Sequence, residues 1–160
     1  MNKSALLAIL LFVVLLSSCG SEAIYEKTSE ISDGEWFYSD TLTYEVTIDD
    51  TLSIYNLYLD LEHSREYPFE NMYVRIHTSF PSGESLSKQV SLELANEAGI
   101  WIGDCGGEVC NTTIPIQMGA YFNQTGTYSF KLEQYMRRNP LPGVNSITLR
   151  IEEAEEQKGS

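Results

Sequence analysis

The stretch that decides the fold is YNLYLDLE at residues 55–62, in which apolar and polar side chains largely alternate one by one. A period of two places one apolar face on a core and one polar face in water, as in a half-buried β-strand. The same alternation occurs at residues 42–49 and 72–80, and in shorter form around residues 90–94, 128–132 and 147–151. These runs predict six strands.

Turn residues separate the runs, as in Asp49-Asp50 and Pro81-Ser82-Gly83. Shorter strands are expected near residues 112–116 and 120–122, and a helix of about two turns fits only residues 133–139, before Pro140. The pattern predicts an all-β fold, a single-domain antiparallel β-sandwich of the Ig-like or jelly-roll-like kind, over residues 36–152. In such sandwiches a tyrosine placed as Tyr128 bonds through its hydroxyl to nearby backbone.

The N-terminal segment has the features of an export signal. Lys3 precedes an unbroken apolar run at residues 5–16, which fits a signal peptide and is too short to span a membrane. The run ends in Leu16-Ser17-Ser18-Cys19, which resembles the lipobox of bacterial lipoproteins. We therefore expect a signal peptide at residues 1–18 and a covalent diacylglycerol with an N-acyl lipid on Cys19, rather than a stray cysteine behind an ordinary signal peptide.

The residues that flank the predicted sandwich are polar. Residues 19–35 are expected to be a lipidated N-terminus and acidic tether, and residues 153–160 a disordered tail. Gly20 follows the lipidated cysteine where an aspartate would favour retention at the inner membrane. This predicts an outer-membrane lipoprotein of the cell envelope, with the periplasmic and surface leaflets both open.

Acidic residues dominate the charge of the chain. The whole sequence carries a formal net charge of −13, and loss of the first eighteen residues removes one lysine and leaves 142 residues at −14. Such a surface repels nucleic acid and anionic headgroups, so neither is an expected partner. An acidic solvated surface explains the composition better than a calcium site does.

Cys105 and Cys110 are the two cysteines that remain once Cys19 carries lipid. An even pair in a glycine-rich loop of an exported chain favours a structural disulfide. The spacing is not that of a CxxC redox motif, and a zinc site would need two further ligands that the neighbouring sequence lacks. No metal site and no cofactor beyond the lipid are expected.

Catalytic motifs are missing from the sequence. No serine lies in a Gly-x-Ser-x-Gly context, and the two histidines, His63 and His77, are expected on water-facing or loop positions. We therefore expect no enzyme and no small-molecule substrate. Exposed aromatics at Tyr58, Tyr73 and residues 36–38 suit a sugar platform or a protein contact, although strands favour tyrosine in any case.

Several segments together resemble the gliding motility lipoprotein GldH family. They are YNLYLDLEH at 55–63, YPFENMYV at 67–74, FPSG at 80–83, GIWIG at 99–103, IPI at 114–116, GTYSFKLEQYMR at 126–137 and NPLPG at 139–143. In order and spacing they cover residues 36–151. The cysteine pair departs from the family pattern, in which this loop is glycine-rich and polar without required cysteines.

The resemblance implies a non-enzymatic outer-membrane lipoprotein that supports gliding and type IX secretion, in contact with other envelope lipoproteins. Arg137, Arg138, Pro140 and Pro142 form our expected partner-binding corner, because two adjacent arginines are unusual in so acidic a chain. A proline-rich loop that only closes the sandwich is the plainer alternative. A carbohydrate-binding surface lipoprotein is the alternative function. Asp40-Thr41-Leu42 and Asp50-Thr51-Leu52 also resemble bacterial O-glycosylation sites.

Overall fold

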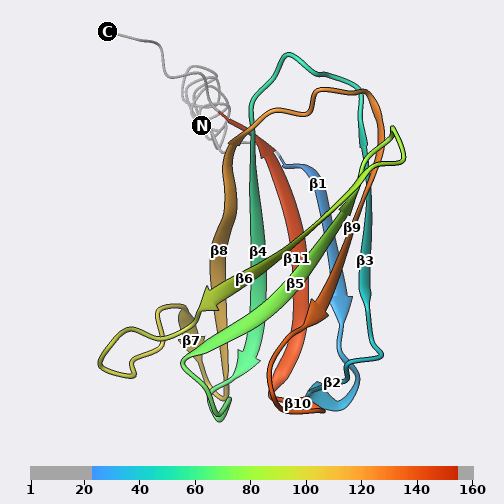
Figure 1. The fold of residues 1–160 in the computed structure, drawn as a ribbon. Helices are drawn as coiled ribbons and strands as arrows, with labels where there is room; N and C mark the ends of the chain where they lie inside the picture. Colours follow the sequence, from blue (N-terminus) through green and yellow to red (C-terminus); the bar gives the residue numbers. More distant parts are fainter. Residues whose placement is uncertain (1–22, 155–160) are drawn as a thin grey trace, which may run out of the picture.

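The computed structural model describes residues 23–154, which form a β-sandwich of two antiparallel sheets and a small two-stranded ribbon (Figure 1). The five-stranded sheet has the order β1 (Ala23–Glu30), β11 (Val144–Glu153), β4 (Tyr55–Ser64), β8 (Val109–Ala120) and β7 (Asp104–Gly106). The four-stranded sheet has the order β3 (Leu42–Ile48), β9 (Gly126–Gln134), β5 (Asn71–Ser79) and β6 (Ser85–Glu93). The ribbon pairs β10 (Leu141–Pro142) with β2 (Glu35–Trp36), next to the 3-10 turn η1 (Ser32–Gly34). This architecture confirms the predicted all-β, single-domain class.

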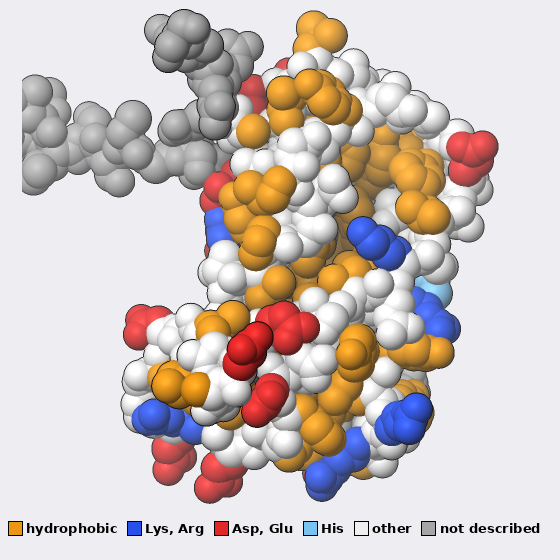
Figure 2. Space-filling view, turned by 60° about the vertical axis from the view of Figure 1, so that its left-hand side comes forward, with side chains coloured by type: hydrophobic (Ala, Val, Ile, Leu, Met, Phe, Trp, Pro, Cys, Tyr) orange, Lys and Arg blue, Asp and Glu red, His pale blue; other side chains and the backbone are white. Residues whose placement is uncertain are grey.

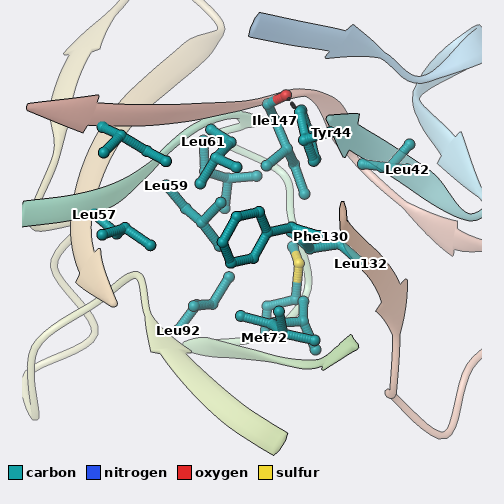
Figure 3. Close-up of a cluster of buried hydrophobic side chains, with 14 of the residues drawn as sticks. Leu42, Tyr44, Leu57, Leu59, Leu61, Met72, Leu92, Phe130, Leu132 and Ile147 are labelled. Atoms are coloured by element: carbon teal, nitrogen blue, oxygen red, sulfur yellow. Dashed lines mark hydrogen bonds between the residues drawn. The ribbon is translucent and has the colours of Figure 1, made fainter. Parts of the chain in front are cut away.

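The core lies between the two sheets, where alternate side chains of each strand meet. Apolar residues from β3, β4, β5, β6, β9 and β11 gather around the ring of Phe130 (Figure 3). In β4 the alternation predicted from sequence is complete, with Tyr55, Leu57, Leu59 and Leu61 all buried. The alternating runs therefore determine which face of each strand is apolar, and the two apolar faces pack together as the sandwich.

Buried tyrosine hydroxyls tie strands and turns together. Tyr44 Oη donates to the carbonyl of Ile147 at 2.8 Å, which links the two sheets through the core (Figure 3). Burial raises the pKa of Tyr44 to about 12. Tyr128 Oη donates to the carbonyl of Gln124 at 3.0 Å, which confirms the expected bond from this tyrosine to nearby backbone.

The prediction of an acidic tether through residue 35 is wrong for residues 23–35. Residues 23–30 form β1, which pairs with β11 along its length, and residues 32–36 form η1 and β2. At the other end of the chain, β11 continues to Glu153, one residue beyond the predicted domain. The signal peptide, Cys19, residues 20–22 and the tail after residue 154 lie outside the described residues.

Three local predictions also need correction. The strand expected at residues 112–116 is part of a longer strand, β8, that runs from Val109 to Ala120. The strand expected at residues 120–122 does not form, because only Ala120 belongs to β8 and Tyr121 and Phe122 lie in no strand. The short helix considered for residues 133–139 does not form, because β9 continues to Gln134 and bends follow. Among residues 23–154 there is no helix of the length and apolarity that crossing a membrane requires.

The strand pairing defines two opposite ends of the sandwich. At the proximal end β1 begins beside the end of β11, since Ala23 pairs with Glu152, and the loops at 49–54, 80–84 and 121–125 lie there. At the distal end lie the segments 31–41, 65–70, 94–103 and 135–143. The ten residues of β11 separate the two ends by about 30 Å.

Candidate binding groove at the distal end

A groove of about 900 Å³ lies at the distal end, over the outer face of the four-stranded sheet. It is formed where β5, β6 and β9 meet the chain that follows β2 and the bend that follows β9. The lining residues are Tyr38, Phe69, Tyr73, Arg75, Gln89, Glu133, Gln134, Tyr135, Met136, Arg137 and Arg138. The groove therefore brings the predicted arginine pair together with aromatic residues that are distant in sequence.

The buried side chain of Gln134 shapes the bend that carries the arginines. Its Nε2 donates to the carbonyl of Arg138 at 3.0 Å, and its Oε1 accepts from the backbone N–H of Met136 at 2.9 Å. A second, longer bond from Nε2 reaches the carbonyl of Trp36 at 3.4 Å. One amide thus satisfies backbone groups of the bend and of β2, as a buried polar group must.

Tyr38 closes one side of the groove and is fixed at both its backbone and its hydroxyl. Its N–H donates to Asn139 Oδ1 at 2.9 Å, and its hydroxyl donates to the carbonyl of Met136 at 2.7 Å. The ring itself stays about half exposed. A fixed, exposed aromatic ring loses little conformational entropy when a partner covers it.

The floor of the groove is a stacked pair of side chains. The guanidinium of Arg75 lies 4.0 Å from the ring centroid of Tyr135, within cation–π range. Tyr135 is held to β5 by its N–H, which donates to the carbonyl of Tyr73 at 2.8 Å. The N–H of Tyr73 in turn lies 3.2 Å from Met136 Sδ, so the bend after β9 stays in contact with the first residues of β5.

The groove is cationic on one side. Arg137 and Arg138 are exposed, and within residues 23–154 neither side chain takes part in an ion pair. The acidic lining residue, Glu133, is bonded to His77 Nε2 at 3.1 Å, and His77 Nδ1 lies 2.6 Å from Ser87 Oγ. The two unpaired guanidiniums are therefore free to bind a carboxylate from another molecule.

Other predicted site residues lie outside the groove. Pro140 and Pro142 are half-buried at and beside β10, where Pro142 pairs with Glu35 in the ribbon. Trp36 is fully buried and donates through Nε1 to the carbonyl of Asp40. Tyr58 lies on the outer face of the five-stranded sheet, under the guanidinium of Arg150. The suggested aromatic surface is thus divided between the two sheets.

The expectation that His63 lies on the surface is wrong. His63 is fully buried, with its ring 4.8 Å from that of Trp101 and 5.8 Å from that of Tyr67. Its Nδ1 lies 2.9 Å from the carbonyl of Ser64, while Nε2 has no partner among the described residues. Burial lowers the pKa of His63. Nowhere in residues 23–154 do three or more potential metal ligands gather.

A disulfide joins Cys105 and Cys110 across the β7–β8 hairpin, with a Cα–Cα distance of 4.0 Å. It lies at the distal end but outside the groove lining. A second cavity, of about 240 Å³, opens between the sheets beside β6 and β8 and is lined mainly by apolar residues such as Leu57, Ile76 and Phe130. The face seen in Figure 2 shows hydrophobic side chains within a hollow of its upper half.

The comparisons with known proteins agree on one family. A family model described as GldH lipoprotein matches residues 23–151. The gliding motility lipoprotein GldH homolog of Christiangramia forsetii is 23% identical over 150 residues, which cover 89% of this chain and 91% of that protein. The gliding motility lipoprotein GldH of Flavobacterium johnsoniae is 23% identical over 140 residues, covering 87% and 86%. The family model spans the sandwich from β1 to β11, the groove included.

Proposed function

The chain belongs to the GldH lipoprotein family, and from this membership we propose that it is an outer-membrane lipoprotein that supports gliding and type IX secretion through protein contacts. Cys19 carries the anchoring lipid, and the sandwich presents its distal groove to a partner in the envelope. The protein works by binding and performs no catalysis.

The observation that carries this proposal is the position of two unpaired arginines in a groove far from the anchored end. Arg137 and Arg138 stand beside exposed rings of Tyr38 and Tyr73, and arginine with tyrosine is the composition that protein-binding hot spots favour. The groove lies about 30 Å from the proximal end. A protein held by lipid at its proximal end reaches its partner with the distal end.

The charge of the groove indicates the chemistry of the partner. In a chain with a formal net charge of −13, a cationic groove stands out locally and attracts a carboxylate-bearing segment, while most of the remaining surface repels it. The proposed partner is therefore a protein of the gliding or secretion machinery that inserts an acidic segment beside Arg137 and Arg138.

Crosslinking in intact envelopes, followed by mass spectrometry of the captured proteins, tests the proposal. The double variant R137E/R138E is expected to lose most of the capture and to keep the thermal unfolding temperature. The matched control K88E/K131E makes the same change of charge on exposed lysines of β6 and β9 outside the groove lining, and is expected to retain capture. Equal capture by both double variants contradicts the groove as the contact site.

The anchor is tested separately by metabolic labelling with palmitate. The wild-type chain is expected to incorporate the label and to fractionate with the outer membrane. Cys19→Ala is expected to fold, to remain unlabelled and to fail to support gliding. Labelling of the Cys19→Ala protein at the wild-type level sinks the assignment of Cys19 as the lipidated residue.

Carbohydrate binding remains the second candidate, because Tyr38, Tyr73 and Tyr135 all line the groove. However, the hydroxyl of Tyr38 is already bonded and one face of Tyr135 is covered by Arg75, which leaves little free ring surface for a sugar. Glycan-array binding that is lost in Tyr73→Ala and kept in R137E/R138E favours the sugar over the protein partner.

A further inference from the structure

The large hydrophobic side chains exposed on the described residues fall into two groups, one at each end of the sandwich. The distal group is mainly aromatic and includes the tyrosines of the groove. The proximal group is mainly aliphatic, and we call it the apolar rim. Its members are Ile24, Leu52, Leu86, Met118 and Tyr121.

Strand register places the apolar rim at the proximal end. Ile24 follows the first residue of β1, and Leu52 lies in the loop that leads into β4. Ala120, which precedes Tyr121, pairs with Tyr55 at the start of β4. Tyr121 and Leu86 both line the smaller cavity, so the start of β6 lies near Tyr121. Met118 lies two residues before the end of β8.

The loop that carries Leu52 is built to hold this side chain outward. The carboxylate of Asp50 accepts from the N–H of Leu52 at 2.8 Å and from the hydroxyl of Ser53 at 2.7 Å. Tyr55 Oη donates to the carbonyl of Asp50 at 2.9 Å, and the N–H of Ala154 donates to the carbonyl of Ile54 at 2.7 Å. Leu52 is nevertheless 89% exposed at the tip of this braced loop.

The length of chain between the anchor and the sandwich fixes what the proximal end faces. Four residue steps separate Cys19 from Ala23, the first residue of β1. Even fully extended, they span at most about 14 Å. A lipid on Cys19 therefore keeps the proximal end beside the bilayer, within reach of the headgroup layer.

We propose that the apolar rim inserts into the lipid interface, so that Leu52 and Tyr121 contact lipid and the sandwich stands on the membrane with its groove outward. This inference rests on the proposed lipidation of Cys19. Burial of a leucine side chain at the boundary between headgroups and acyl chains is favourable. Tyrosine is enriched there because its ring is apolar and its hydroxyl polar. The two contacts fix an orientation that a single flexible anchor leaves free.

The charge at the same end specifies the lipid. Asp49, Glu84 and Glu153 surround the rim, so anionic headgroups repel this surface. The contact is thus one of apolar insertion into a zwitterionic surface, and it strengthens as the fraction of anionic lipid falls.

The test uses the mature lipidated protein reconstituted into vesicles of phosphatidylethanolamine and phosphatidylcholine. An NBD fluorophore is attached at Leu52→Cys and, in a matched control, at Ile100→Cys in an exposed loop of the distal end. We expect the emission at position 52 to shift to the blue and to be quenched by spin-labelled lipid, with neither effect at position 100. Replacing part of the phosphatidylcholine with phosphatidylglycerol is expected to reduce the blue shift.

The outcomes separate this inference from the proposed anchor. If the protein floats with the vesicles and position 52 remains as accessible to water as position 100, the rim does not insert and the inference is overturned while the anchor stands. A protein that does not float overturns both. A blue shift that grows with phosphatidylglycerol also overturns insertion into a zwitterionic surface.

A label-free measurement covers the case in which the fluorophore itself drives insertion. Amide hydrogen exchange of residues 49–54 and 121–125 is expected to slow when the lipidated protein binds vesicles, and exchange of residues 96–103 to stay unchanged. In Leu52→Asp the added protection at 49–54 is expected to disappear. Equal exchange with and without vesicles at the proximal loops overturns the proposal.

Discussion

Gly103 illustrates how closely the distal loop packs against β8. A Cβ added at this glycine would lie 2.3 Å from Thr112 Oγ1 and 2.4 Å from the backbone carbonyl oxygen of Asn111. Because one of these atoms belongs to the backbone of a strand, the strain cannot be relieved by a side-chain rotation. We expect Gly103→Ala to lower the free energy of unfolding by about 1–3 kcal/mol, measured by urea denaturation.

Gly106 provides the matched control for this prediction. It is the last residue of β7, three residues after Gly103, and an added Cβ would meet nothing within 4 Å. Gly106→Ala is therefore expected to change the free energy of unfolding by no more than about 0.5 kcal/mol. Equal destabilisation by both alanines would mean that the loss of glycine itself, rather than the contact with Thr112 and Asn111, lowers the stability.

His63 is predicted to make stability depend on pH. Its pKa is lowered by burial, so below its ordinary value of 6.5 the unfolded chain binds a proton that the folded chain does not. Its contribution is thus fully present above pH 6.5 and is lost as pH falls towards the folded pKa. We expect the free energy of unfolding to fall by at most about 2 kcal/mol between pH 7 and pH 5.

Two variants isolate the effect of His63. His63→Phe keeps an aromatic ring against Trp101 and Tyr67, and the carbonyl of Ser64 still accepts from the N–H of Tyr67. It is therefore expected to remove the slope between pH 7 and pH 5, whereas His77→Gln is expected to keep it. A slope that survives in His63→Phe would assign the pH dependence to other groups.

At the scale of single elements, strand parity explains both the successes and the failures of the sequence analysis. β3 and β4 were predictable because one face of each is buried throughout, and β5 because the same is true of it as far as Ile76. The same parity, continued two residues past Leu61, places His63 on the core face. The prediction failed because histidine was counted as a polar strand end, although the signal was present in the sequence.

Edge strands were the least predictable elements. β1 has exposed or half-buried residues at every position, so its sequence lacks the apolar alternation that a buried face requires. β8 was divided in two at residues 117–119, where Gly119 has a positive φ, and the strand also contains Pro115. Proline is tolerated there because β7 pairs only with residues 109–111, which leaves Pro115 on an edge.

The role of β1 as a strand rather than a tether can be measured directly. In the unlipidated protein, deletion of residues 23–30 is expected to lower the free energy of unfolding by at least about 3 kcal/mol, because β11 loses its ladder hydrogen bonds on one side. The control inserts six glycine and serine residues between Glu22 and Ala23 and is expected to leave stability unchanged. If the deletion variant has the same free energy of unfolding as the full protein, residues 23–30 act as a tether and not as a strand of the sheet.

At the scale of the whole molecule, the sequence predicted the arginine pair but not the groove that contains it. The lining comes from β5, β6, β9 and the segment after β2, and their proximity depends on strand order, which the alternation of side chains does not specify. The same limit applies to the apolar rim, whose members lie almost a hundred residues apart along the chain.

Net charge also acts on the whole molecule. With 23 acidic and 10 basic residues, and two close arginine–carboxylate ion pairs among residues 23–154, the folded state carries substantial self-repulsion. Salt screens this repulsion. We expect the unfolding temperature to rise by roughly 3–5 °C between about 10 and 150 mM sodium chloride, as relief of about 1 kcal/mol implies. Potassium chloride is expected to raise the unfolding temperature by the same amount. An unfolding temperature that falls with added salt would show that the ion pairs outweigh the repulsion.

The direction of β1 has a mechanical consequence. The strand starts at the proximal end, where the proposed lipid holds it, and runs antiparallel to β11 towards the distal end. A pull between the membrane and the proposed partner in the groove is therefore directed along the strands, at right angles to their hydrogen bonds. The β1–β11 ladder is then loaded in shear, with all its bonds sharing the force, instead of being peeled one bond at a time. A protein built in this way resists extension along the axis on which it is pulled.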